Sequence, residues 1–266
     1  MDTRAYVGVA PTNSRLRWEL RIEPKHCSGF GTLFGGVGLG AAAIAAAEVA
    51  DRPLVWATGQ FVDQAKPGEL LSMDVQLLAE GRKSTQIRVR CHVEDREILG
   101  VYASLGQREI PETHQFVVMP EVAAPLECPL RNRLSGSRSA LADVEQRLAI
   151  GSDEHDPETP VADGRSALWF KTPADLVVDT GFLSIVGDFV PWGTRQAMRT
   201  HVSSSSLDNT IRVARPVQTE WVLADTRITS VHNGYAHGDV HLWAQDGTLM
   251  ATASQTAQLR EFRPRS

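Results

Sequence analysis

The chain has 266 residues, of which 42% are hydrophobic, 22% charged and 6% aromatic, a composition typical of a globular protein and not of a disordered or fibrous one. This length is too great for one small core and fits two compact domains. The formal net charge of -5 provides no broad basic surface, so we expect no nucleic-acid partner.

The cysteines and the N-terminal segment bear on the cellular compartment. Cys27, Cys91 and Cys128 are odd in number and contain no C-x-x-C pair, which favours reduced thiols over a disulfide framework. The first residues show no basic segment followed by an apolar one, the pattern of a signal peptide. We therefore expect a cytoplasmic protein.

A glycine- and alanine-rich stretch, GFGTLFGGVGLGAAAIAAAEVA at residues 29–50, admits three interpretations. A membrane helix needs about 20 strongly apolar residues, whereas glycine and alanine contribute little and Glu48 opposes insertion, so we expect no membrane insertion. The letters G-x-G-x-x-A from residue 36 match a dinucleotide fingerprint, but no buried strand precedes them. We predict a packed helix over residues 36–50, with one smooth face that a sheet can approach closely, formed by Gly36, Gly40, Ala43 and Ala47.

Four runs rich in β-branched residues follow this helix and are separated by turn residues: RPLVWATGQFVDQ (52–64), ELLSMDVQLLAEG (69–81), KSTQIRVRCHVED (83–95) and REILGVYASLGQRE (96–109). A helix followed by an antiparallel meander predicts an α+β domain in which the helix fills the concave side of the sheet.

The second half of the chain repeats this pattern. Residues 69–104 align without a gap with residues 220–255, which places turns on turns and pairs Ser104 with Gln255. Such a repeat implies two similar domains packed as a pseudo-dimer. We expect an N-terminal domain over residues 1–110, a linker over 111–135 and a C-terminal domain over 136–266.

The segment DTGFLSIVGDFVPWGTRQAM, residues 179–198, occupies the place of the second helix. Asp179 or Thr180 is the expected N-cap, and Pro191 is expected to end the regular part of the helix. The segment GSDEHDPETPVADG, residues 151–164, is predicted to be a polar loop.

Five segments, FGGVGLGAAAIAAA, QFVDQAKPGE, GDFVPW, SSSLDNTIRVARP and LMATASQTAQLR, together resemble the bacterial acyl-CoA thioesterase II family. The resemblance covers nearly the whole chain apart from the linker and the ends. It implies a double hotdog fold, in which each half wraps an antiparallel β-sheet around a long helix. It also implies hydrolysis of fatty acyl-CoA to free fatty acid and CoA, without metal or other cofactor.

The same resemblance implies three catalytic residues. The family uses an Asp on the second hotdog helix, a Thr just before the D-H of the following strand and a Gln on the last strand, which correspond here to Asp188, Ser206 and Gln255. Ser204 or Ser205 would take the place of Ser206 if the strand shifted. The chain departs from the family at Ser206, which keeps the hydroxyl, and at Asn209, which replaces the His.

The residue types suit thioester hydrolysis, which needs an oriented water, a proton acceptor and donors for the oxyanion. Asp188 could accept the proton while Gln255 and Ser206 hold the water. Backbone N–H groups of Gly35 and Gly36, at a helix N-terminus, are the expected oxyanion or acyl-CoA donors. The alternative for Asp188 is a carboxylate that bonds only to backbone where the helix breaks.

Other functions receive less support. His237, Asp239 and His241 alternate along one strand face, but this alternation also describes the solvent side of a half-buried strand, so we expect no metal. A hotdog hydratase would need a His five residues after Asp188, where Gly193 stands. The main alternative is a non-catalytic acyl-CoA or acyl-carrier binding protein. The exposed face of the combined sheet is a candidate for pairing in a homo-oligomer.

Overall fold

The computed structural model describes residues 1–110, 112–131, 140–152, 163–198 and 202–261. In the N-terminal part of these residues the elements are α1 Thr3–Val7, β1 Ala10–Pro11, β2 Arg17–Arg21, η1 Pro24–His26, α2 Gly35–Ala50, β3 Leu54–Phe61, β4 Leu70–Glu80, β5 Ser84–Val93 and β6 Arg96–Gly106. The C-terminal part contains η2 Pro125–Glu127, β7 Gln146–Ile150, β8 Arg165–Lys171, α3 Thr180–Val186, α4 Val190–Ala197, β9 Val202–Ser206, β10 Asp208–Val213, β11 Trp221–His232, β12 Tyr235–Ala244 and β13 Leu249–Glu261.

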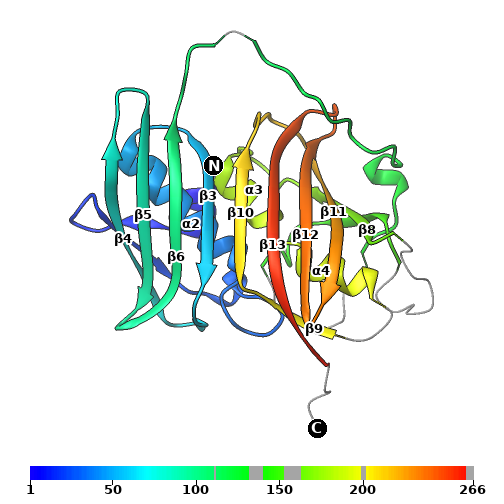
Figure 1. The fold of residues 1–266 in the computed structure, drawn as a ribbon, viewed down its shortest axis with the longest axis horizontal. Helices are drawn as coiled ribbons and strands as arrows, with labels where there is room; N and C mark the ends of the chain where they lie inside the picture. Colours follow the sequence, from blue (N-terminus) through cyan, green and yellow to red (C-terminus); the bar gives the residue numbers. More distant parts are fainter. Residues whose placement is uncertain (111, 132–139, 153–162, 199–201, 262–266) are drawn as a thin grey trace.

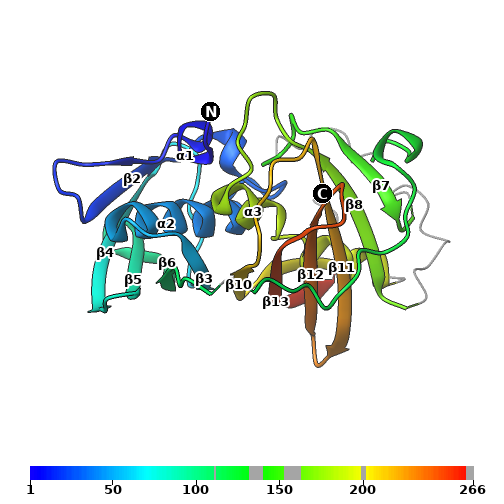
Figure 2. The same ribbon diagram turned by 90° about the horizontal axis from the view of Figure 1, so that it is seen from above.

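Within the described residues, the strands form one 13-stranded sheet in the order β1-β2-β4-β5-β6-β3-β10-β13-β12-β11-β8-β7, with β9 beside β13. The two halves meet where β3 pairs antiparallel with β10, and Thr58 lies opposite Thr210 (Figure 1). Figure 2 shows α2 and α3 on the same side of this sheet. The expected α+β double hotdog architecture is confirmed. None of the helices that the structure describes is both long and apolar enough to cross a membrane.

The helix predicted over residues 36–50 is confirmed as α2, but the partner of its smooth face is not the sheet. A methyl group added at Gly40 would lie 2.9 Å from the carbonyl oxygen of Gly181, so this face contacts α3 of the other half. Toward the sheet α2 presents Leu39, whose side chain would lie 3.3 Å from a methyl group at Gly59 on β3. Glycine on α2 therefore allows the close contact between the two halves.

The two meanders share the register of their first hairpin but not of their second. Val75 pairs with Val89 in one half, and Thr226 pairs with Val240 in the other, as the repeat predicts. In the next hairpin Ile87 pairs with Ala103, whereas its counterpart Gly238 pairs with Gln255. The predicted match of Gln255 with Ser104 is therefore wrong, and Gln255 corresponds to Ala103. The reason is the longer connection between β12 and β13, which bulges do not fully absorb.

The second helix is broken in two. Asp179 is the N-cap of α3, as expected, and its carboxylate accepts a hydrogen bond from Phe182 N at 2.9 Å. Gly187 ends α3, and Pro191 lies in the first turn of α4. The prediction that Pro191 ends the helix is therefore wrong: the ring is tolerated in a first turn, where no intrahelical N–H bond is lost, and it starts the next helix.

The described part of the linker covers the outer face of the C-terminal sheet. Cys128 joins a second apolar cluster with Trp169 and Trp221, and Trp169 Nε1 donates to the Ala123 carbonyl at 3.1 Å. Figure 2 shows this segment crossing the side of the sheet opposite to the helices. The corresponding face of the N-terminal sheet leaves Tyr102 exposed. Pairing of this open sheet face in a homo-oligomer stays a prediction. Most of the polar loop predicted over residues 151–164 lies outside the described residues.

Candidate active site

Asp188 lies in the break between α3 and α4 and reaches the other half of the molecule. Its side chain is buried, with 4% of the residue surface exposed. Gly36 N, at the start of α2, donates to Asp188 Oδ2 at 2.5 Å, and Gln255 Nε2 donates to Asp188 Oδ1. The carboxylate is thus bound by both halves of the repeat. The sequence-based alternative, an Asp bonded only to backbone, does not describe this arrangement.

Gln255 is held in one orientation by its neighbours. The Gln255 Oε1 accepts a hydrogen bond from Val190 N at 3.1 Å, and this donor requires an oxygen at that position. The amide nitrogen therefore faces Asp188 and Ser206, and the distance from Nε2 to Ser206 Oγ is 3.1 Å. Both Gln255 amide hydrogens and its carbonyl oxygen are used within the site.

The serine run has one register in the structure. Ser206 lies opposite Ala257 and is the serine that contacts Gln255. Ser205 Oγ accepts instead from Gln258 Nε2 at 3.0 Å, and Ser204 Oγ donates to the Pro191 carbonyl at 3.4 Å. The structure therefore brings together Asp188, Gln255 and Ser206, and places the two alternative serines elsewhere.

Gly35 and Gly36 form the α2 side of the site. A methyl group on Gly35 would lie 2.8 Å from Asp188 Oδ2 and 2.7 Å from the Phe61 ring, and one on Gly36 would lie 2.9 Å from the Asp188 Cβ. A side chain at either position would have to displace its neighbours. The expectation that both N–H groups serve an oxyanion needs a correction, because Gly36 N–H is already bound to Asp188. For Gly35 N–H, no acceptor is found among the described residues.

Burial controls the charge of Asp188. Desolvation raises the pKa of this carboxyl to about 7, and the hydrogen bonds from Gln255 and Gly36 oppose the rise. Phe189, the next residue along the chain, packs its ring edge to face against the rings of Phe34 and Phe170, with centroids 6.2 Å and 4.7 Å away. A carboxyl group with a pKa near neutrality can exchange a proton at physiological pH.

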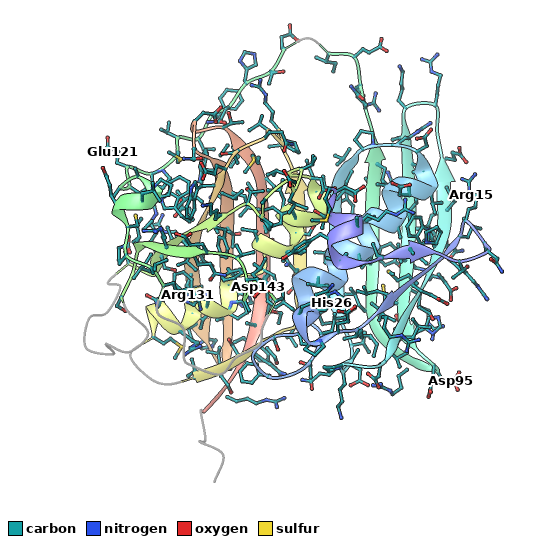
Figure 3. All side chains as sticks on the ribbon, turned by 180° about the vertical axis from the view of Figure 1, so that it is seen from behind. Arg15, His26, Asp95, Glu121, Arg131 and Asp143 are labelled. Atoms are coloured by element: carbon teal, nitrogen blue, oxygen red, sulfur yellow. The ribbon has the colours of Figure 1, made fainter. Side chains whose placement is uncertain are left out.

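His237 and Asn209 are two further polar residues to which the sequence draws attention. His237 lies on the outer face, where its Nδ1 is 3.2 Å from Thr256 Oγ1, and the described residues contain no group of three His, Cys, Asp or Glu side chains that could hold a metal ion. Asn209, which the sequence marks only as a departure from the family, is buried on β10. Figure 3 shows the helix side of the molecule, with Arg131 beside α4 and His26 near the start of α2.

The chain matches two family models. Residues 22–106 match the acyl-CoA thioesterase N-terminal domain, and residues 120–259 match the acyl-CoA thioesterase C-terminal domain. A protein of Novosphingobium aromaticivorans DSM 12444, whose crystal structure is named as that of a thioesterase, is 31% identical, with a TM-score of 0.84 over 94% of this chain and 98% of that one.

More distant solved structures share the fold. A hot dog protein of Alicyclobacillus acidocaldarius is 18% identical, with a TM-score of 0.85 over 96% of this chain and 97% of that one. The acyl-CoA thioesterase II TesB2 of Mycobacterium marinum is 19% identical, with a TM-score of 0.75 over 98% of this chain and 97% of that one. Among curated proteins, no match was found. On the two family models and the 31% identical structure, the chain belongs to the acyl-CoA thioesterase II family of double hotdog proteins.

Proposed function

We propose that this protein hydrolyses fatty acyl-CoA thioesters to free fatty acid and CoA. The observation that carries the proposal is the buried Asp188 carboxyl, which Gln255 and the start of α2 bind from opposite halves of the chain. A binding protein has no need for a desolvated carboxylate with a pKa near 7, because burying a charge is costly. A general base does need one.

In the proposed reaction, the oxygen of a water molecule attacks the thioester carbonyl carbon while ionised Asp188 takes one of its protons. The carbon–sulfur bond then breaks, and the proton passes from Asp188 to the CoA sulfur. The products are the carboxylic acid and the CoA thiol, and Asp188 returns to its ionised form. Gln255 and Ser206 position the carboxylate and the water, and every proton transferred comes from the water itself.

The oxyanion that forms on the carbonyl oxygen needs a donor, and Gly35 N–H is the best candidate. It lies at the N-terminus of α2, where the helix dipole favours negative charge. Its neighbour Gly36 N–H holds Asp188, so the two glycines have separate roles: one orients the base and the other binds the oxyanion.

The direct test measures release of the CoA thiol from short, medium and long acyl-CoAs by wild type, Asp188→Asn and Asp179→Asn. We expect Asp188→Asn to lower kcat by about 10² or more, because the amide cannot accept the proton. Asp179→Asn is the control: it also removes a carboxylate next to α3 and keeps an acceptor for the Phe182 N–H cap, so we expect turnover to be retained although the bond from Thr3 N–H is lost. Unchanged turnover in Asp188→Asn would contradict the assignment of the base.

Binding without turnover would favour the alternative function. If wild type binds acyl-CoA in calorimetry but releases no thiol from any member of the panel, the protein is an acyl-CoA or acyl-carrier binding protein.

We also propose a cytoplasmic location. It is supported by Cys27, Cys91 and Cys128, which are all buried free thiols in the structure.

A further inference from the structure

The side chain of Asn209 is almost completely buried, with 1% of the residue surface exposed. Among the residues that the structure describes, its Oδ1 has no hydrogen-bond partner. A buried amide oxygen without a partner loses its bonds to water and gains nothing in return, so such groups are uncommon. The position of this acceptor suggests what it binds.

Asn209 lies on the same sheet face as Gln255 and next to it. Thr210 pairs with Ser254, so the next residues along the two strands, toward the site, are Asn209 and Gln255. Ile211 and Ala253, one step to the other side of that pair, are buried against the helices, and side chains alternate along a strand. Asn209 therefore points to the helix side, where Gln255 contacts Asp188.

The N-terminal half provides an internal comparison for this pair of residues. There, Ala57 on β3 pairs with Ala103 on β6, and Ala103 is the counterpart of Gln255. The corresponding pair in the C-terminal half is Asn209 and Gln255. Both positions are thus alanine in the half that lacks the carboxylate and carboxamide in the half that has it. This joint change indicates that Asn209 belongs to the same site as Gln255.

The hydrogen bonds already present restrict what Asn209 can do. The Gln255 carbonyl oxygen is occupied by Val190 N–H, and Ser206 Oγ accepts from Gln255 Nε2. An attacking water has two hydrogens, of which Asp188 takes one. The second hydrogen needs an acceptor other than the thioester carbonyl, because the water directs its lone pair at the carbonyl carbon and its hydrogens then point away from that group.

We propose that Asn209 Oδ1 accepts the second hydrogen of the attacking water and so directs the oxygen lone pair at the thioester carbon. This inference rests on the proposed thioesterase function and adds a residue to its site. Asn209 orients the water and takes no proton: the proton goes to Asp188, and the bond to Asn209 persists in the tetrahedral intermediate.

The test compares Asn209→Leu with Asn209→Ser, and with Thr210→Val as a control on the outward face of the same strand, all by thiol release from acyl-CoA. We expect Asn209→Leu, which is similar in size and has no acceptor, to lower kcat by about tenfold or more with KM within about twofold of wild type. Asn209→Ser keeps an acceptor oxygen and should recover part of kcat. Thr210→Val should behave as wild type.

The pH profile and the thermal midpoint of unfolding identify a merely structural role. The midpoint of the kcat/KM profile should stay that of wild type in Asn209→Leu, because Asp188 remains the base. Leucine also removes the unpaired buried amide, so Tm should not fall. A shifted pH midpoint, a fall in Tm that accounts for the lost activity, or an unchanged kcat would overturn the inference.

The proposed function can fail separately. If wild type is active and loses activity in Asp188→Asn but not in Asn209→Leu, only the role of Asn209 is wrong. If wild type releases no thiol from any acyl-CoA of the panel, both the function and this inference are wrong.

Discussion

The starts of α2 and α3 are related positions in the two halves, yet they differ in chemistry. At the start of α2, Gly36 N–H binds the carboxylate of Asp188 from the other half. At the start of α3, a methyl group on Gly181 would meet Ile44 at 2.8 Å and Thr3 at 3.0 Å, so apolar groups and the N-terminal helix fill the space. One end is a polar site and the other is part of the core.

The same contrast extends to Asp188 and its counterpart in the other half. Counted from the N-caps Phe34 and Asp179, Asp188 corresponds to Ala43, which is completely buried. A repeat with two-fold symmetry would build two sites, each from both halves. In this chain the second position, at the start of α3, lacks the carboxylate and is closed by α1. That end packs as part of the core, and the candidate catalytic residues gather at the start of α2.

Substitution of the two helix-start glycines tests this contrast and gives the largest expected effect. In Gly36→Ala the added methyl group would lie 2.9 Å from Ile185 Cα and from the Ser184 carbonyl oxygen, which are backbone atoms that cannot yield easily. We expect the free energy of unfolding to fall by about 1–3 kcal/mol. We also expect thiol release to be lost, because Asp188 is displaced.

Gly181→Ala is the matched variant in the other half. Its methyl group would first meet the end of the Ile44 side chain, which can change rotamer, so we expect a smaller loss of stability and retained turnover. Chemical denaturation and thiol release measure both quantities. Equal loss of activity in the two variants would show that the two helix starts are not functionally different.

The repeat, the helix α2 and the two meanders could be predicted from the sequence because their signals are local: apolar periodicity, turn residues and a repeated pattern. The element against which each of them packs could not be predicted in this way. Gly36 and Gly40 predict a smooth helix face, but only the packing of the halves decides that α3 covers it. The one-residue shift that makes Gln255 the counterpart of Ala103 arises from the longer connection between β12 and β13, which a gapless alignment cannot represent.

The candidate site likewise combines residues that the sequence predicts with contacts that only the structure shows. Asp188, Ser206 and Gln255 were accessible through resemblance to a family, whose motifs place them in order along the chain. The bond between Gly36 N–H and Asp188 joins residues from opposite halves, and no local pattern encodes it. Asn209 was visible as a departure, but its significance depends on burial and on an unpaired oxygen, which only three-dimensional structure shows.

The pH dependence of activity is a property that the polar site should show and its apolar counterpart should not. We expect this effect to be of intermediate size. Burial raises the pKa of Asp188 from 3.8 to about 7. Because only the ionised form can take a proton, kcat/KM should rise with pH and level off above a midpoint near 7. A flat profile between pH 5 and 9 would contradict Asp188 as the base.

The same pKa shift affects stability. The folded state holds the Asp188 proton more tightly than the unfolded chain does, so this group contributes most below pH 4, and its contribution is lost as pH rises to about 7. Asp188→Asn should remove that part of the decline. Chemical denaturation of both proteins at several pH values measures it, and parallel curves would show that the pKa of Asp188 is not raised by folding.

We expect the smallest effect, on the free energy of unfolding, from Thr3→Val at the start of α3, which α1 closes. Thr3 is completely buried, and its Oγ1 has no hydrogen-bond partner among the described residues, while its backbone N donates to Asp179 at 2.9 Å. Valine has the same shape, keeps the backbone bond and removes the unpaired hydroxyl, so the free energy of unfolding should stay equal or rise by up to about 1 kcal/mol. Thiol release should not change, because α1 fills the second helix start without taking part in the reaction. A loss of turnover with stability intact would instead place a functional polar group at that end, and the two halves would then have to share the chemistry.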